Sequence, residues 1–172
     1  FTCAEQAGPA RGQELFLPYL SGERTPHNDA LVRGAFLNLD HDTSAGTLAQ
    51  AVLEGVAFTL ADGLEALHDA GTTVERLAVI GGGARSAYWG RIISAAFETP
   101  LVYLRGGEVG PALGAARLAQ VAVDQADPRE VCIAPPVERV VEPQTQDIDL
   151  LAPKKAAFRA AYPHISPKVK GQ

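Results

Sequence analysis

The chain reads LAVIGGGARS from Leu77 to Ser86, and this stretch decides the fold. Its first four residues form a short apolar run, which is typical of a buried strand. Three glycines follow, and beyond them an apolar stripe with helical spacing is formed by Trp89, Ile92, Ile93, Ala96 and Phe97. The stretch therefore predicts a strand, a glycine turn and a helix in succession.

The glycine turn has two interpretations. Because glycine has no side chain, the backbone can approach a ligand closely, and the N-terminus of the next helix offers free N–H groups and a partial positive charge. An anionic or adenosine-type ligand would fit such a turn. A tight connection without a ligand has the same local sequence, so the choice needs evidence from elsewhere in the chain.

Two rival nucleotide motifs can be tested directly. A dinucleotide-binding fingerprint needs a glycine at its third position, where this chain has Ser86. The acidic residue that such a fold carries roughly 20 positions further on would be Glu98 or Glu108, and neither ends a second strand. An NAD-binding domain is therefore the weaker alternative. A P-loop is excluded, because the sequence contains no Gly-Lys-Ser or Gly-Lys-Thr triplet.

Strands and helices alternate along the rest of the chain, which predicts an α/β protein. A long helix is expected over Thr47–Ala70, with an apolar stripe formed by Leu48, Val52, Val56, Leu60, Leu64 and Leu67. Further strands are expected at 14–20, 34–39 and 101–104, and further helices at 111–123 and 153–162. The proline-containing residues 124–152 predict a loop-rich connection.

The loop GERTPHND, from Gly22 to Asp29, concentrates polar and ionisable side chains. Such loops often carry binding residues, but a solvated hairpin tip has the same composition, so the sequence leaves its role open. The four histidines and two cysteines lack metal-ligand spacing, so no metal site is predicted. No hydrolase motif of the GxSxG type is present.

The composition narrows the class of protein. At 172 residues the chain suffices for one domain or one lobe of a larger enzyme, and its net charge of -5 with interspersed signs argues against nucleic acid as a partner. No apolar run reaches the roughly 20 residues of a membrane span, and no signal peptide opens the chain, so we expect a cytoplasmic protein without a membrane partner. The chain starts at Phe1 and contains no methionine, which suggests a piece of a longer protein.

Four stretches agree in order and spacing with a known family. They are LFLPYLSGERTPHND (15–29), AVLEGVAFTLADGLEAL (51–67), IGGGARSAYWGRII (80–93) and ALGAARLA (112–119). Together they resemble the C-terminal domain of the FGGY family of carbohydrate kinases, nearest to its bacterial xylulokinases. The resemblance covers residues 12–123.

The resemblance implies an actin-like ATPase, ribonuclease H-like fold that forms one lobe of a two-lobed sugar kinase. Residues 1–123 would form the core of the nucleotide-binding lobe, and residues 124–172 a connection and a C-terminal helix packed on the same lobe. The N-terminal lobe, on the same or a separate chain, would be the partner that this sequence lacks. The resemblance assigns the adenosine contacts to Gly81, Gly82, Gly83, Ala84 and Ser86, whereas Trp89 is better explained as core.

The implied reaction moves the γ-phosphoryl group of ATP, bound with Mg²⁺, to D-xylulose and gives D-xylulose 5-phosphate. The family's proton acceptor is an aspartate in a glycine- and asparagine-rich motif of the first lobe. This chain has no such motif, and Asp29, Asp40, Asp42 and Asp62 do not match it. We therefore expect no catalytic residue here and no activity of the chain alone. A kinase for L-ribulose, glycerol or gluconate, a non-catalytic nucleotide-binding module, and a homodimer all stay open.

Overall fold

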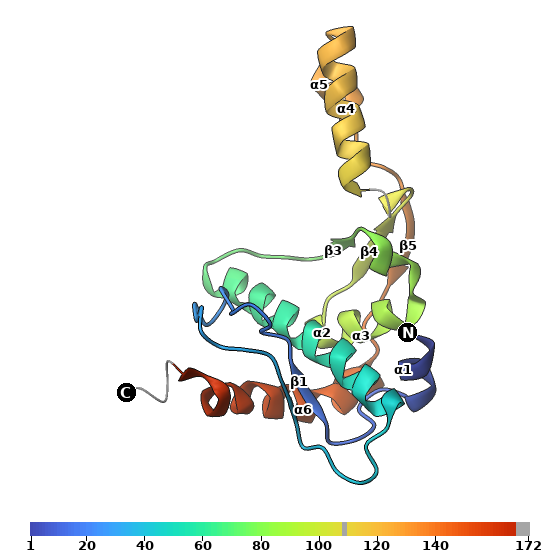
Figure 1. Ribbon diagram of the computed structural model, residues 1–172. Helices are drawn as coiled ribbons and strands as arrows, with labels where there is room; N and C mark the ends of the chain where they lie inside the picture. The colour runs from blue at the N-terminus through green and yellow to red at the C-terminus, as the bar shows by residue number, and fades with distance from the viewer. Residues whose placement is uncertain (108–109, 168–172) are drawn as a thin grey trace.

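The computed structural model describes residues 1–107 and 110–167 (Figure 1). Glu108, one of the two acidic residues considered above, lies outside this part of the chain, as do residues 168–172. The described elements, in chain order, are α1 (Thr2–Ala7), β1 (Leu15–Leu17), β2 (Ala35–Leu37), α2 (Ala45–Asp69), β3 (Leu77–Val79), the 3₁₀ turn η1 (Gly82–Arg85), α3 (Ala87–Phe97), β4 (Leu101–Leu104), α4 (Gly110–Asp124), α5 (Pro128–Val131), β5 (Val137–Val141) and α6 (Thr145–Ile165).

The strands form two small sheets. β1 and β2 pair antiparallel, with Leu15 opposite Leu37, as the two apolar runs on either side of the polar loop predict. In the second sheet β3 and β4 are parallel, and β5 is antiparallel to β4 on its other side. Parallel neighbours need a crossover connection, which α3 provides. The predicted α/β class is confirmed.

The region after α4 is more regular than the sequence suggests, and the prediction of a loop-rich connection over 124–152 is wrong. It contains α5 and β5, and α6 begins at Thr145, well before the expected helix at 153–162. Pro153, the first residue of the expected helix, lies inside α6. A proline removes one helical hydrogen bond, but Leu151 and Phe158 on the same helix are fully buried. Burial of these two side chains in the core outweighs the low preference of proline for a helix interior.

The main core lies between α2, α3, α6 and β1. Its largest buried side chains are aromatic: the Phe58 and Phe158 rings lie 5.6 Å apart, and Tyr19 approaches Phe158 at 6.2 Å. These three rings come from the loop after β1 and from two helices, α2 and α6, that are far apart in sequence. They therefore hold the C-terminal helix onto the N-terminal half of the chain.

The long helix α2 leaves most of its apolar stripe outside the core of this chain. Of the six stripe residues only Leu64 is buried, while Leu60 and Leu67 are 49% and 51% exposed. The buried face instead combines Phe58 and small alanines with Gln50, Glu54 and Asp62. α3, α6 and β1 pack on the opposite, partly polar side of the helix. An apolar face of α2 is left uncovered in this chain.

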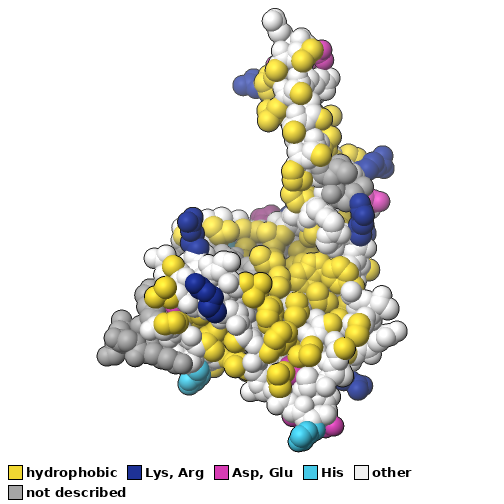
Figure 2. Space-filling view, viewed as in Figure 1, with side chains coloured by type: hydrophobic (Ala, Val, Ile, Leu, Met, Phe, Trp, Pro, Cys, Tyr) yellow, Lys and Arg dark blue, Asp and Glu magenta, His cyan; other side chains and the backbone are white. Residues whose placement is uncertain are grey.

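Helix α4 projects from the body of the molecule and carries α5 alongside it (Figure 1). Every one of its residues is at least partly exposed, although only Arg117 and Asp124 are charged. Figure 2 shows apolar side chains along this helix and over the body below it. Within residues 1–107 and 110–167, no helix combines the length and apolarity needed to cross a bilayer.

Candidate functional site

The glycine turn connects β3 to α3 through one 3₁₀ turn. Gly81 has φ 86°, a left-handed conformation that glycine adopts without strain, and its N–H donates to the carbonyl of Gly107 at 3.0 Å. The N–H of Ala84 then returns to the Gly81 carbonyl at 3.0 Å. The expected order of strand, glycines and helix is confirmed, with η1 as an additional step before α3.

The backbone of the turn is exposed where the glycines lie. A Cβ atom built on Gly82 would meet no atom within 4 Å, and the backbone of Gly82 is not left-handed. Neither packing nor conformation within the described chain therefore requires glycine at this position. Gly83 differs, because its Cβ would lie 3.3 Å from the Trp89 ring. The free surface at Gly82 is where a ligand could approach the backbone.

Ser86 begins the helix that follows. Its hydroxyl oxygen accepts the N–H of Trp89 at 3.1 Å, so the side chain caps α3. The hydroxyl proton can still be donated to a ligand. Trp89 packs against the main core and against a second, smaller cluster formed by Ile93, Leu101 and Tyr103, which confirms the expectation that it belongs to the core.

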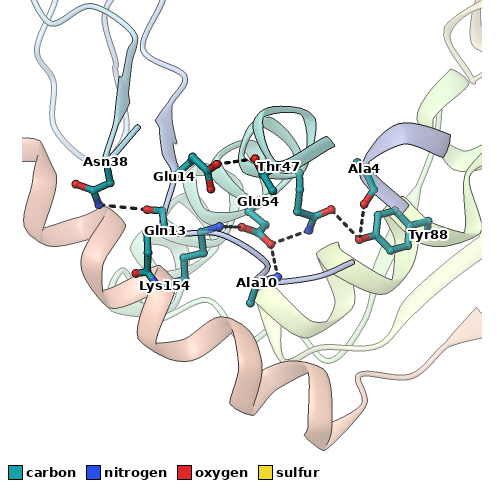
Figure 3. Close-up of polar contacts among 10 residues, drawn as sticks. Ala4, Ala10, Gln13, Glu14, Asn38, Thr47, Glu54, Tyr88 and Lys154 are labelled. Carbon is teal, nitrogen blue, oxygen red and sulfur yellow. Dashed lines mark hydrogen bonds and ion pairs between the residues drawn. The ribbon is translucent and has the colours of Figure 1, made fainter. Parts of the chain in front are cut away.

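A buried polar network holds the first turn of α3 in place (Figure 3). The Tyr88 hydroxyl donates to the Gln50 side chain at 2.7 Å, and Gln50 donates to Glu54 at 2.6 Å. Glu54 also accepts the N–H of Ala10 and pairs with Lys154 of α6. Desolvation by burial raises the pKa of Tyr88 to about 12, so the phenol stays protonated and can donate. The network ties the start of α3 to α2, α6 and the N-terminal segment.

A cavity of about 340 Å³ opens beside the turn. Its walls include Ala84 and Arg85 of the turn, Tyr103 of β4, and Glu138 and Arg139 of β5. This volume is near the lower end of the roughly 300–1,000 Å³ usual for small-molecule sites. Tyr103 lies in the strand expected at 101–104, which carried no sign of a site, and Arg139 lies in β5, which was not expected as a strand.

Two hollows of about 440 Å³ lie elsewhere, one between α2, α3 and α6 and one between α3 and α6. Lys155 on their walls donates to the Ala96 carbonyl at 2.9 Å, and Arg159 pairs with Asp62. The cavity beside the glycine turn instead borders exposed turn backbone. We therefore take the turn as the candidate site.

The polar loop Gly22–Asp29 is anchored at its end. Asp29 is buried and accepts the N–H groups of Leu31 and Val32, the Tyr162 hydroxyl at 3.1 Å and the Ser166 hydroxyl at 2.5 Å. The Ser166 hydrogen bond, together with these others, holds the pKa of Asp29 below its ordinary value.

The His27 ring of the same loop stacks on the Tyr162 ring, with the ring centroids 3.5 Å apart. Asp29 and His27 thus fasten the loop to α6, while Arg24 and Thr25 remain exposed.

No group of three or more histidine, cysteine or acidic side chains that could hold a metal ion occurs in the described part of the chain. Among the described residues, Glu138 of β5 is the one carboxylate that lines the cavity beside the turn. These residues do not form a ligand set for Mg²⁺, which prefers several oxygen ligands in octahedral geometry.

Comparison with known proteins identifies the class. Residues 2–123 match the C-terminal domain of the FGGY family of carbohydrate kinases, and the chain belongs to this family. Its fold is that of the actin-like ATPase sugar kinases, as expected.

Individual sugar kinases are similar to this chain in sequence and structure. The xylulose kinase of Escherichia coli K12 is 42% identical over 95% of this chain and 34% of its own length. A crystal structure of a xylulose kinase from Brucella ovis is also 42% identical, with a TM-score of 0.80 over 95% of this chain and 34% of that one. A gluconate kinase from Lactobacillus acidophilus is 28% identical with a TM-score of 0.71, over 93% of this chain and 33% of that one. The chain spans about a third of the length of these relatives.

Proposed function

We propose that this chain is the ATP-binding lobe of a kinase that transfers the γ-phosphoryl group of ATP to D-xylulose and forms D-xylulose 5-phosphate. The observation that carries the proposal is the exposed backbone at Gly82, in a turn that follows a parallel strand and precedes a helix. Ligands of open α/β sheets bind beyond the carboxyl ends of parallel strands, where this turn lies.

The adenosine part of ATP would lie against Gly81, Gly82, Gly83 and Ala84, with the Ser86 hydroxyl as a donor. A side chain at Gly82 would occupy the space that the ligand needs. The N-terminus of α3 adds a partial positive charge near the same place. An NAD-binding domain is less well supported, because Ser86 replaces the third glycine and the chain belongs to a kinase family.

A second lobe would cover the exposed apolar surfaces. Leu118 and Val123 of α4 are 67% and 81% exposed, and the outer stripe of α2 is also uncovered. An apolar surface of this kind in a soluble protein usually marks an interface. The occupant we propose is the N-terminal lobe of the same kinase, since the family match is to a C-terminal domain and the relatives are about three times as long. A second copy of this chain is the alternative.

This lobe would contribute binding and closure rather than proton transfer. The chain lacks the glycine- and asparagine-rich motif that carries the family's aspartate base. Closing two lobes around ATP and sugar would exclude water and align the donor with the acceptor. Mg²⁺ would enter with the phosphates and be held on the other lobe, because the described residues here do not fit it. Such an enzyme would work in the cytoplasm, where its ATP is.

The sugar is proposed from the relatives whose names specify xylulose, while a gluconate kinase shares the fold. Phosphorylation of D-xylulose by the chain mixed with a first-lobe polypeptide tests the proposal. We expect turnover with D-xylulose to exceed that with L-ribulose, glycerol or gluconate, and no turnover by the chain alone. A folded complex that binds ATP but phosphorylates none of these sugars would favour the non-catalytic module.

A further inference from the structure

Tyr103 and Arg139 face each other across the β4–β5 ladder. They are direct register partners, and the guanidinium of Arg139 lies over the Tyr103 ring at 3.5 Å from its centroid. This is a cation–π contact, and arginine is well suited to it because its planar group can stack on the ring and still donate hydrogen bonds at its edge. Tyr103 is buried, so the arginine stacks on a fixed surface.

The hydroxyl end of Tyr103 fits against α3. A Cβ atom at Gly90 would overlap this hydroxyl, so the close approach of β4 and α3 depends on glycine there. Gly90 lies in α3, the helix that Ser86 caps. The ring is therefore held between the helix that follows the glycine turn and the arginine of β5.

Arg139 also reaches the turn itself. One terminal nitrogen of its guanidinium donates to the carbonyl of Ala84 at 3.0 Å. The N–H of Ala84 donates to the Gly81 carbonyl and so closes the turn. The contact with Arg139 therefore fixes the residue at which the turn closes. The contact joins residues that are 55 positions apart in sequence. Both partners line the cavity beside the turn.

We propose that Arg139 is a positioning residue for nucleotide binding: stacked on Tyr103, it holds the Ala84 carbonyl and thereby sets the conformation of the glycine turn that receives ATP. This inference rests on the proposed function. It assigns a role to β5, which lies beyond the segment matched to the family domain. The exposed face of Gly82 stays free because the turn is held at Ala84.

ATP titration of the full 172-residue chain, detected on the protein, tests this role with three variants. We expect R139A to raise the Kd for ATP about tenfold, as suits the loss of a hydrogen bond from a charged donor. R139K keeps the charge but loses the planar stack, so its Kd for ATP should lie between that of the unaltered chain and that of R139A. R76A removes an exposed arginine before β3 and serves as the matched control, with an unchanged Kd.

The complete two-lobed enzyme provides a readout that separates positioning from stability. There R139A should raise the KM for ATP about tenfold, from the same lost contact, and leave the KM for the sugar unchanged. If R139A binds ATP as the unaltered chain does, or raises both KM values equally, the proposed role of Arg139 is wrong. Failure of the unaltered chain to bind ATP contradicts the proposed function instead. If R139A does not fold, the comparison of R139K with R76A decides.

Discussion

Lys154 of α6 forms an ion pair with Glu54 of α2 at 2.6 Å, with both side chains at least nine-tenths buried. Glu54 also accepts hydrogen bonds from Gln50 and from the N–H of Ala10 (Figure 3). Four contacts converge on this region from α2, α6, α3 and the segment after α1. Removing the cation would leave a buried carboxylate without its charge partner.

We expect Lys154→Ala to lower the free energy of unfolding by about 3–5 kcal/mol, because breaking a buried ion pair leaves an uncompensated charge. Thermal unfolding followed by circular dichroism measures the effect. The control is Glu65→Ala, which removes an exposed partner of Arg159 and should cost no more than about 1 kcal/mol. Equal losses for the two variants would show that Glu54 does not depend on Lys154.

The buried carboxyl of Asp29 should make the thermal stability of the chain depend on pH. Its folded pKa lies below the ordinary value, chiefly through the Ser166 hydrogen bond, so its carboxylate stabilises the fold at pH values above the unfolded pKa of about 4. That contribution is lost as the pH falls through the lower, folded pKa. The Tm gap between the unaltered chain and Asp29→Asn should therefore be widest near neutral pH and close at the acid end.

Thermal melts at successive pH values from neutral to strongly acidic test this gap. Ser166→Ala removes one donor to Asp29, so the Tm gap between this variant and Asp29→Asn should be smaller than the gap of the unaltered chain. Asp149→Asn, at an exposed position on α6, should leave the Tm profile unchanged. A gap between the unaltered chain and Asp29→Asn that stays constant down to the lowest pH would contradict the assigned role of the carboxylate.

Gly82→Val should separate binding from folding. The position has room for a side chain and an ordinary backbone conformation, so the Tm should change by no more than a few degrees. The same side chain would occupy the space proposed for adenosine, and the Kd for ATP should rise by a hundredfold or more, on the order of a 3 kcal/mol clash. Gly63→Ala, which also meets no atom within 4 Å, is the control with unchanged binding. Tight ATP binding by Gly82→Val would mean that the ligand does not lie over this turn.

Leu118→Glu should weaken association of this chain with the first lobe at least tenfold, because it places a charge in an apolar interface. The chain alone should keep its Tm, since the side chain is 67% exposed there. Gln120→Glu on the same helix is the matched control and should have a smaller effect. Sedimentation of the two polypeptides, alone and mixed, distinguishes a lobe interface from self-association. Loss of a dimer of this chain, with lobe binding intact, would identify α4 as a homodimer contact.

The fold was predictable where local sequence carries strong periodicity. The alternation of strands and helices around Leu77–Ser86, and the stripe of α3 from Trp89 to Phe97, follow directly from apolar spacing. The buried face of α2 was not predictable, because periodicity shows that a stripe is apolar but not which element covers it. The stripe through Leu60 and Leu67 faces away from this chain's own core.

The candidate site was predictable only in part. The glycines of the turn stand out in the sequence because three of them follow one another directly after an apolar run. Arg139 gave no such signal: it follows two prolines in a segment read as a connection, and its partners Tyr103 and Ala84 lie far away in sequence. Contacts of this kind arise from sheet pairing, which local patterns do not encode. The capping use of Ser86 could have been inferred from its place before a helix.

Titration of the chain with ATP and, separately, with NAD tests the central claim most directly, using the fluorescence of Trp89 beside the turn as the signal. Trp89 is the single tryptophan of the sequence, and its ring lies next to Gly83. We predict a saturable change with ATP, its loss in Gly82→Val, and no saturable change with NAD. Saturable binding of NAD without binding of ATP would contradict the assignment of this chain as the nucleotide-binding lobe of a sugar kinase.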